Sequence, residues 1–401
     1  MPGNARLALV DSLRGLALMA IILLHCIEHY NCFYTPQWQP EWLNALDSAF
    51  ASTVWMLFAG KAYATFSLLF GFSFYIQMRN ARARGCDFRW RFAWRMLLLA
   101  GFAQLHALFY NGDILLLYAV CGLILIPASR LNNKALLAIA LFLLLQPIDW
   151  GHIIVSAVNP SYVDLNNRFA AFASQAEQIA MHGNLWQTWA DNITNGQLYS
   201  NFWQVEAGRI TQTPALFMLG MWLGRKAYFV KSRASIRFWR KTAAYALVLW
   251  AVLYFVQPYV VALSSAETWV SHIGIALSMP ANFCMMAVLV ALMSLIWFSA
   301  GDGFRFQRFA IPIGRMSLTA YITQSLLGVT IFYNYGLGLY RYCGPILSAV
   351  IAAGIIAALW WTGRMWLRSH RQGPLERVWK SLTWIGSSAT VEKSLNHCAS
   401  K

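Results

Sequence analysis

The stretch DSLRGLALMAIILLHCIEH, residues 11–29, is a long apolar run with polar residues at both ends. Its length is close to the roughly 20 residues that an α-helix needs to cross the hydrocarbon core of a bilayer. No small-residue cleavage site follows Leu16–Leu24, so we interpret the run as a retained first span and not as a signal peptide. The stretch therefore predicts an integral membrane protein.

The rest of the chain has the composition of a membrane protein. Of its 401 residues, 59% are hydrophobic and 11% are charged, whereas a soluble domain carries about 25% charged residues. Hydropathy predicts about ten spans, at residues 14–31, 51–77, 95–111, 113–129, 135–156, 211–225, 242–263, 272–299, 311–333 and 344–363. The expected fold class is all-α, a polytopic membrane bundle of about ten transmembrane helices.

Basic residues predict how these spans are oriented. The net charge is +16, and ten alternating spans would place every basic cluster on one face of the membrane. The clusters are Arg6 and Arg14; Arg79, Arg82, Arg84, Arg89, Arg91 and Arg95; Arg130 and Lys134; Arg225, Lys226, Lys231, Arg233, Arg237, Arg240 and Lys241; Arg305, Arg308 and Arg315; and Arg364, Arg368, Arg371, Arg377, Lys380, Lys393 and Lys401. By the positive-inside rule this face, with both termini, is cytoplasmic. The bases outside the clusters are Lys61, Arg168, Arg209 and Arg341.

The domain organisation follows from the same pattern. Residues 1–380 are expected to form a single integral membrane domain, and residues 381–401 a polar cytoplasmic tail. An insertion on the outer side, at about residues 157–210, contains two weakly amphipathic stretches, 167–182 and 185–199, that predict helices lying on the membrane surface. The bilayer is thus a partner, and no nucleic acid is expected because no nucleic-acid-binding motif accompanies the basic residues.

The seven cysteines do not indicate a disulfide scaffold or a thiolate zinc site, because they are scattered and contain no C-x-x-C pair. Cys32 and Cys343 fall in predicted outer segments, and their pairing is left open, as is the formation of a homodimer.

Two ionisable residues on the first span are candidates for function, because charged or titratable groups at membrane depth are costly. Arg14 and His25 are 11 positions apart, which corresponds to about 16 Å along a helix. A neutral imidazole can accept a proton from a hydroxyl or amine, and a guanidinium can hold a phosphate. The structural alternatives are an interfacial anchor for Arg14 and a helix-packing residue for His25.

Residues 25–29 also match the H-x-x-E-H pattern of inverted zincins. No downstream acidic ligand accompanies the pattern, so no metal is predicted, and Glu28 is expected near the outer mouth of a cavity. A second group comprises His106 and Asp113, which follows the turn residue Gly112. Asp113 is interpreted either as the N-cap of the next helix or as a carboxylate that orients a catalytic histidine.

Two further polar features carry no assigned role. Lys61 lies inside the predicted span 51–77 and requires a partner or a wet cavity. Glu206 and Arg209, three positions apart, predict a mutual ion pair.

Several of these residues lie in motifs that resemble those of YeiB-type bacterial membrane proteins. The motifs are DSLRGLA (residues 11–17), FSLLFGF (66–72), the hairpin from Gly101 to Tyr118, PALFMLGMWLGR (214–225), GRMSLTAYITQS (314–325) and GPLERVW (373–379). They run in order over nearly the whole chain. The resemblance implies a multi-pass protein of the bacterial plasma (inner) membrane.

The YeiB-type proteins are similar in fold to two groups of membrane acyltransferases, the lysosomal heparan-glucosaminide N-acetyltransferases and the bacterial polysaccharide O-acyltransferases. The resemblance implies transfer of an acyl group from cytoplasmic acyl-CoA, held by Arg14 and Arg315, to a cell-envelope glycan or lipid on the outer side. His25 would be the general base, oriented by Asp113 or Glu28. Many YeiB-type proteins carry Asn at the position of His25, so His106 or Asp113 is the alternative.

The competing hypothesis is a transporter or exporter of a small solute or lipid, in which the same polar groups bind the solute or relay protons. Such a protein is expected to have two related halves around a midplane site. No internal repeat is visible in the sequence.

Overall fold

The computed structural model describes residues 7–159, 161–162, 168–263, 267–301 and 303–385. Every regular element within these ranges is a helix, which confirms the predicted all-α class. The α-helices are α1 (Ala8–Ile27), α2 (Glu41–Phe58), α3 (Lys61–Arg82), α4 (Arg89–Ala107), α5 (Leu115–Leu123), α6 (Leu125–Ala128), α7 (Asn133–Leu144), α8 (Pro147–Val158), α9 (Arg168–His182), α10 (Leu185–Ile193), α11 (Asn195–Glu206), α12 (Arg209–Lys226), α13 (Arg233–Ala262), α14 (Glu267–Ser299), α15 (Arg305–Arg315), α16 (Ser317–Phe332), α17 (Pro345–Ser369) and α18 (Pro374–Thr383). A short 3-10 helix, η1, spans Leu339–Arg341.

Several of these helices have the length and apolar composition of membrane spans. Among the described residues, five segments qualify: Ala8–Ile27, Glu41–Arg82, Arg233–Ala262, Thr268–Ser299 and Pro345–Ser369. Helices α7 and α8, bent by 52° at their junction, form a sixth if the pair is one broken span. The chain is thus a multi-pass membrane protein, while about ten spans remains a prediction from hydropathy.

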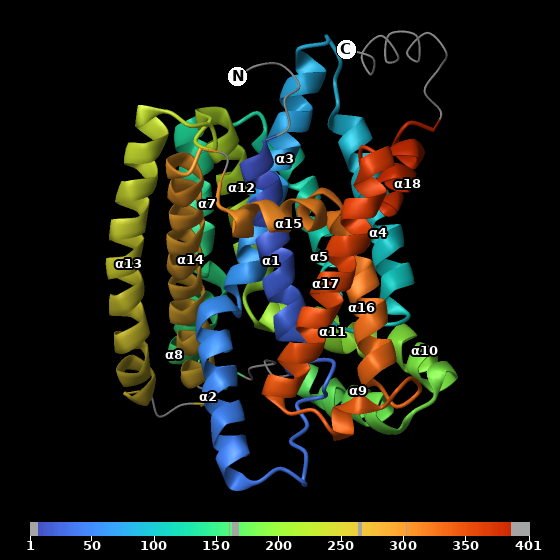
Figure 1. The fold of residues 1–401 in the computed structure, drawn as a ribbon. Coiled ribbons are helices and arrows are strands. Elements are labelled where there is room, and N and C mark those ends of the chain that lie inside the picture. Colours follow the sequence, from blue (N-terminus) through green and yellow to red (C-terminus); the bar gives the residue numbers. More distant parts are fainter. Residues whose placement is uncertain (1–6, 160, 163–167, 264–266, 302, 386–401) are drawn as a thin grey trace.

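Two predicted spans are broken where the backbone leaves the helical region. The span expected at 51–77 consists of α2 and α3, which meet at Gly60 in the left-handed conformation (φ 73°). The span expected at 311–333 consists of α15, which lies across the bundle, and α16, which runs along it (Figure 1). Hydropathy averages apolarity over a window of residues and does not report the backbone conformation that produces such a break.

The predicted basic loops lie together in space. The upper end of the bundle in Figure 1 contains the first residues of α1, α7 and α13 and the last residues of α3, α12, α14 and α17. All the described basic clusters belong to these helix ends and to the neighbouring parts of α4, α15 and α18. The shared end agrees with the loop pattern in the sequence, whereas its cytoplasmic orientation stays a prediction.

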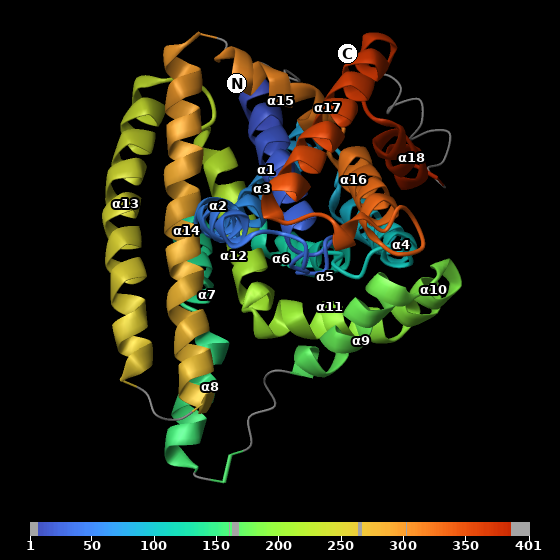
Figure 2. The same ribbon diagram turned by 60° about the horizontal axis from the view of Figure 1, so that its bottom comes forward.

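The insertion that was predicted on the outer side forms three helices instead of the two that were predicted. Helices α9, α10 and α11 lie across the end of the bundle opposite to the basic loops (Figure 2). The predicted stretch 167–182 corresponds to α9, apart from residue 167, which lies outside the described residues. The stretch 185–199 is divided at Thr194, which ends α10 and precedes α11.

The described part of the predicted tail continues α18 to Thr383, and residues 386–401 lie outside the described residues. Cys32 and Cys343 are both free and buried. No disulfide therefore joins the two segments that they occupy.

Candidate active site

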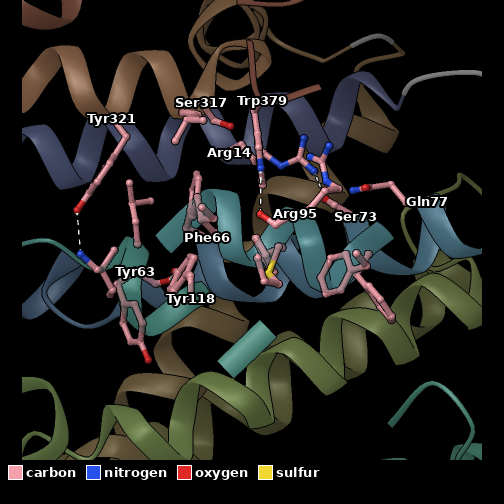
Figure 3. A pocket seen from close by; sticks show the side chains of 18 of the residues that line it. Arg14, Tyr63, Phe66, Ser73, Gln77, Arg95, Tyr118, Ser317, Tyr321 and Trp379 are labelled. Carbon is pink, nitrogen blue, oxygen red and sulfur yellow. Dashed lines mark hydrogen bonds between the residues drawn. The ribbon is translucent and has the colours of Figure 1, made fainter. Parts of the chain in front are cut away.

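A cavity of about 190 Å³ enters the bundle between α1, α3, α4, α5, α16 and α18 (Figure 3). At one end of the cavity, Arg14 and Arg95 lie beside Ser73 and Gln77 (Figure 3). Tyr321 and Tyr63 lie at the other end. The cavity therefore joins a cationic end to an end rich in hydroxyl groups.

The cationic end is held by contacts between distant helices. Arg14 donates a hydrogen bond to the Ser73 hydroxyl, and its Nη1 lies 3.3 Å from Oδ1 of Asp11. The guanidinium of Arg95 lies 4.0 Å from the ring centre of Trp379, a cation–π contact. Two guanidinium groups at one mouth favour an anionic ligand with several oxygens, such as a phosphate.

Arg315 does not belong to this end, although the family resemblance implied a role for it in donor binding. Its Nη2 donates to the carbonyl oxygen of Arg371 at 3.1 Å, and it is not among the residues that line the cavity. Arg95 takes the second cationic position. Helix α4 begins at Arg89, whereas hydropathy began a span at residue 95, so Arg95 was assigned to the loop.

The walls between the two ends are aromatic and apolar, with Phe66, Phe70, Phe74, Phe92 and Met96 among the lining residues. Stacking between Phe70 and Phe217, whose centroids are 4.7 Å apart, ties this wall to α12. Such a passage suits an apolar chain or a thioester better than a hydrated ion.

Three tyrosines supply the hydroxyl groups of the inner end. The Tyr118 hydroxyl lies 2.6 Å from that of Ser67, and the Tyr63 hydroxyl lies 2.7 Å from that of Thr213. The Tyr321 oxygen accepts a hydrogen bond from the backbone N–H of Ile114 at 3.4 Å. That acceptor role leaves the hydroxyl proton of Tyr321 able to donate to a ligand.

A histidine–carboxylate pair lies directly behind Tyr321. Nδ1 of His106 is 2.7 Å from Oδ1 of Asp113, and the His106 and Tyr321 ring centroids are 5.2 Å apart. Asp113 Oδ2 accepts the backbone N–H of Leu116 at 3.2 Å, so this carboxylate both caps α5 and orients His106. One oxygen of Asp113 therefore caps α5 and the other pairs with His106, while a catalytic role of this pair stays a prediction.

The pairing leaves His106 with a free basic nitrogen. Its side chain is buried, and Nε2 has no hydrogen-bond partner among the described residues. An imidazole that donates Nδ1–H to a carboxylate carries its lone pair on Nε2. This is the arrangement of a general base with its orienting group.

The other predicted residues gather around Tyr110. The His25 and His106 rings lie 5.3 and 5.8 Å from the Tyr110 ring, centroid to centroid. Nδ1 of His25 is 3.3 Å from the Tyr30 hydroxyl and 3.4 Å from Nε2 of Gln324. His25 thus adjoins the His106–Asp113 pair, but it does not line the cavity.

Glu28 does not contact His25. Its Oε2 lies 3.8 Å from Nε2 of His29, and its Oε1 is buried without a hydrogen-bond partner among the described residues. Neither proposed orienting carboxylate therefore reaches His25. Within the described part of the chain, no group of three His, Cys, Asp or Glu side chains is arranged to hold a metal ion.

Arg209 is a further cation of the site that the sequence did not assign. Its guanidinium lies 4.0 Å from the ring centre of Trp203 and 4.6 Å from that of Tyr63. The predicted ion pair with Glu206 is wrong, because Oε1 of Glu206 accepts the backbone N–H of Arg168 instead. The sequence feature that could have pointed to Arg209 was its position outside the basic clusters.

Helix α18 closes one side of the cavity and is anchored by Glu376. Oε1 of Glu376 accepts the backbone N–H groups of Leu318 and Thr319 at 2.7 and 3.2 Å, and Oε2 accepts the Thr319 hydroxyl at 2.6 Å. Glu376 therefore caps α16 from another helix. The anchor positions Trp379 against Arg95.

We expect Glu376→Gln to lower the free energy of unfolding by about 1–2 kcal/mol, because the amide cannot replace both acceptor oxygens. Thermal unfolding of the purified protein measures the loss. Lys380→Gln, an exposed change on the same helix, is the control. Equal melting temperatures for the two variants would contradict the capping role.

Comparison with known proteins finds two families that match different parts of the chain. Residues 6–168 match the catalytic part of heparan-alpha-glucosaminide N-acetyltransferase, and residues 223–386 match a protein family of unknown function, DUF418. The former range contributes α1, α3, α4 and α5 to the cavity, and the latter contributes α16 and α18.

Relatives of similar length are found in several bacteria. The uncharacterized protein YxaH of Bacillus subtilis is 26% identical over 98% of this chain and 97% of its own length. The uncharacterized protein YeiB of Escherichia coli is 28% identical over 96% of this chain and 98% of its own length. An uncharacterized 39.9 kDa protein of Bacillus acidopullulyticus is 23% identical over 95% of this chain and 94% of its own length. No solved structure matches the chain at a significant level.

Proposed function

This chain belongs to the YeiB family of multi-pass membrane proteins, and we propose that it transfers an acyl group from cytoplasmic acyl-CoA to a hydroxyl or amine of a cell-envelope acceptor. The similarity of its first half to the catalytic part of an N-acetyltransferase supports acyl transfer. The observation that carries the proposal is one cavity with two arginines at its mouth and a buried histidine–carboxylate pair behind its inner end.

Each part of the cavity has a role in this reaction. Arg14 and Arg95 would hold the phosphates of the acyl donor. The aromatic walls would enclose its apolar arm, which brings the thioester to the tyrosine end. Tyr321 would donate its hydroxyl proton to the carbonyl oxygen, where negative charge develops during attack.

His106 would act as the general base. Nε2 takes the proton of the acceptor hydroxyl or amine as the acceptor atom bonds to the thioester carbon. The carbon–sulfur bond then breaks, and the sulfur of coenzyme A receives the proton from the imidazolium. Asp113 keeps the ring oriented and stabilises its charged form.

The acceptor would reach the pair from the end covered by α9–α11. The carbonyl oxygen of Asp113 accepts hydrogen bonds from Ser200 and Gln204 of α11 at 3.3 and 3.0 Å, so this helix contacts the loop that carries Asp113. Trp203 and Arg209 lie on the same side of the site, next to His29. Aromatic and charged side chains together favour a polar acceptor such as a glycan or lipid head group.

Removal of the cations at the mouth tests the donor site. We expect Arg14→Gln and Arg95→Gln each to raise the KM for acyl-CoA by about tenfold to a hundredfold, with a smaller change in kcat. The measurement is transfer or hydrolysis of radiolabelled acetyl-CoA by the purified protein in lipid nanodiscs. Arg305→Gln, an exposed cation at the same end of the bundle, is the control, and equal KM values for all variants would contradict the assignment.

The acceptor is tested in cells. Mass spectrometry of the cell envelope, with and without the gene, should reveal an acyl modification that disappears with the protein and with His106→Ala. A small molecule that accumulates on one side of the membrane, with no modification lost, would instead favour the transporter hypothesis.

A further inference from the structure

A second cavity, of about 510 Å³, lies on the other face of α1 and shares no lining residue with the first. It is lined by residues of α1, α2, α3, α14, α15 and α17. Most lining side chains are Ala, Leu, Met, Val, Ile or Phe, and the α1 part extends from Leu13 to Leu23. These ten positions correspond to about 15 Å of helix, so the cavity is an elongated apolar groove.

Lys61 carries the only charge among the described residues that line this groove. The residue is 7% exposed, and its Nζ donates to the carbonyl oxygen of Trp55 at 3.5 Å. An ammonium group has three N–H donors, and this long contact is the one hydrogen bond of Nζ within the described structure. No ion pair of Lys61 is found there either.

Other polar groups nearby do not satisfy the amine. The hydroxyl of Thr65 donates to the carbonyl oxygen of Lys61, one helical turn away, at 2.9 Å. Gly60, the residue before α3, has a left-handed backbone that separates α2 from α3. The break between α2 and α3 lies between the two ends of the bundle (Figure 1), so Lys61, the first residue of α3, lies away from the basic end.

We propose that this groove binds a long-chain fatty acid, with its carboxylate on Lys61 and its chain along the apolar wall. A carboxylate supplies the opposite charge and the acceptor oxygens that the amine lacks. An apolar groove facing α14 and α17 suits an alkyl chain, and its single cation defines where the head group binds. This binding site does not depend on the proposed acyl transfer.

A fatty acid fits the position better than a phospholipid. The phosphate of a phospholipid, including that of phosphatidate, is charged at neutral pH and keeps its water at the headgroup level. A carboxylic acid can enter the apolar region in its neutral form. Once it has released its proton to water, its carboxylate pairs with the Lys61 ammonium. The occupant is therefore a single-chain acid.

Binding of tritiated palmitate to the full chain in phosphatidylcholine nanodiscs tests the site. We expect saturable binding that Lys61→Met weakens about tenfold to a hundredfold, because the charge-assisted contact is lost while the side-chain length is kept. Ala353→Trp, which fills the rim of the groove at an exposed position, should abolish binding. Lys226→Met, an exposed lysine on α12, is the matched control and should bind as the wild type does.

Competitors and melting temperatures separate the remaining outcomes. Hexadecanol should compete at least about tenfold more weakly than palmitate, and dipalmitoyl phosphatidate should not compete. Palmitate should raise the melting temperature of the wild type and not that of Lys61→Met. A cooperative melting curve of Lys61→Met without palmitate shows that the variant is folded. Equal binding to wild type and Lys61→Met, equal competition by hexadecanol, or displacement by phosphatidate would each overturn the proposal.

Discussion

His106→Ala is expected to reduce the rate of acyl transfer by about 10²- to 10⁴-fold, the usual contribution of a positioned general base. The reason is the ring nitrogen of His106 that Asp113 does not hold. Nε2 is buried and has no hydrogen-bond partner among the described residues, while Nδ1 lies 2.7 Å from the carboxylate. The measurement is single-turnover transfer from radiolabelled acyl-CoA to a cell-envelope extract. The KM for acyl-CoA should change little, because His106 does not line the donor cavity.

Asp113→Asn separates the two roles of this carboxylate. An asparagine side chain still caps α5 through Leu116, so the fold should persist, but it no longer stabilises a charged imidazole. We expect most of the activity to be lost at an unchanged melting temperature. If His25→Ala abolishes transfer while His106→Ala retains it, the base is His25 and the assignment to His106 is wrong.

Gly220→Ala is expected to prevent stable folding, with a loss of about 3 kcal/mol or more. A Cβ atom on Gly220 would lie 1.8 Å from the carbonyl oxygen of Leu68, and one on Gly71 would lie 1.9 Å from that of Phe217. Helices α3 and α12 thus touch backbone to backbone, and neither side can yield as a flexible side chain would. Small residues allow such close approach of helices in membranes.

The yield and melting temperature of the purified variant measure this effect. Gly101→Ala is the control, because a Cβ at this helical position meets nothing within 4 Å. That variant should be as stable as the wild type or slightly more stable, since alanine favours a helix over glycine. Wild-type stability of Gly220→Ala would contradict the close packing of α3 on α12.

Close backbone contacts at glycines also explain why two of the sequence motifs contain glycine. A Cβ on Gly15 would lie 1.9 Å from the carbonyl oxygen of Ala310, and one on Gly314 would lie 1.8 Å from that of Asp11. The motif around Arg14 and the motif around Arg315 therefore meet where α15 crosses α1. The sequence offered these motifs as family features, and their shared role in packing requires the fold.

The sequence located the helices better than it located their breaks. The first span was predicted at 14–31 and the helix extends over Ala8–Ile27. The span at 311–333 was wrong as a single element, because Met316 separates a helix across the bundle from one along it. Hydropathy averages over a window of residues, so it does not give the direction in which each of the two helices runs.

The first helix illustrates what the sequence determined by itself. The apolar run of residues 11–29 and the low charge of the whole chain are enough for a helical membrane protein, because only helices satisfy their own backbone groups in lipid. The spacing of Arg14 and His25 also follows from helix geometry alone. The sequence also showed that Lys61 and Arg209 lie outside the basic clusters. It did not indicate which residues they contact.

Only the tertiary structure decided which side chains share a site. Asp113 pairs with His106 and not with His25, Arg95 replaces Arg315 at the cavity mouth, and Arg209 stacks on Trp203. Each of these outcomes depends on how helices distant in the chain rotate and cross. Hydropathy and spacing describe one helix at a time, whereas a catalytic pair or a binding cavity is a property of several helices packed together.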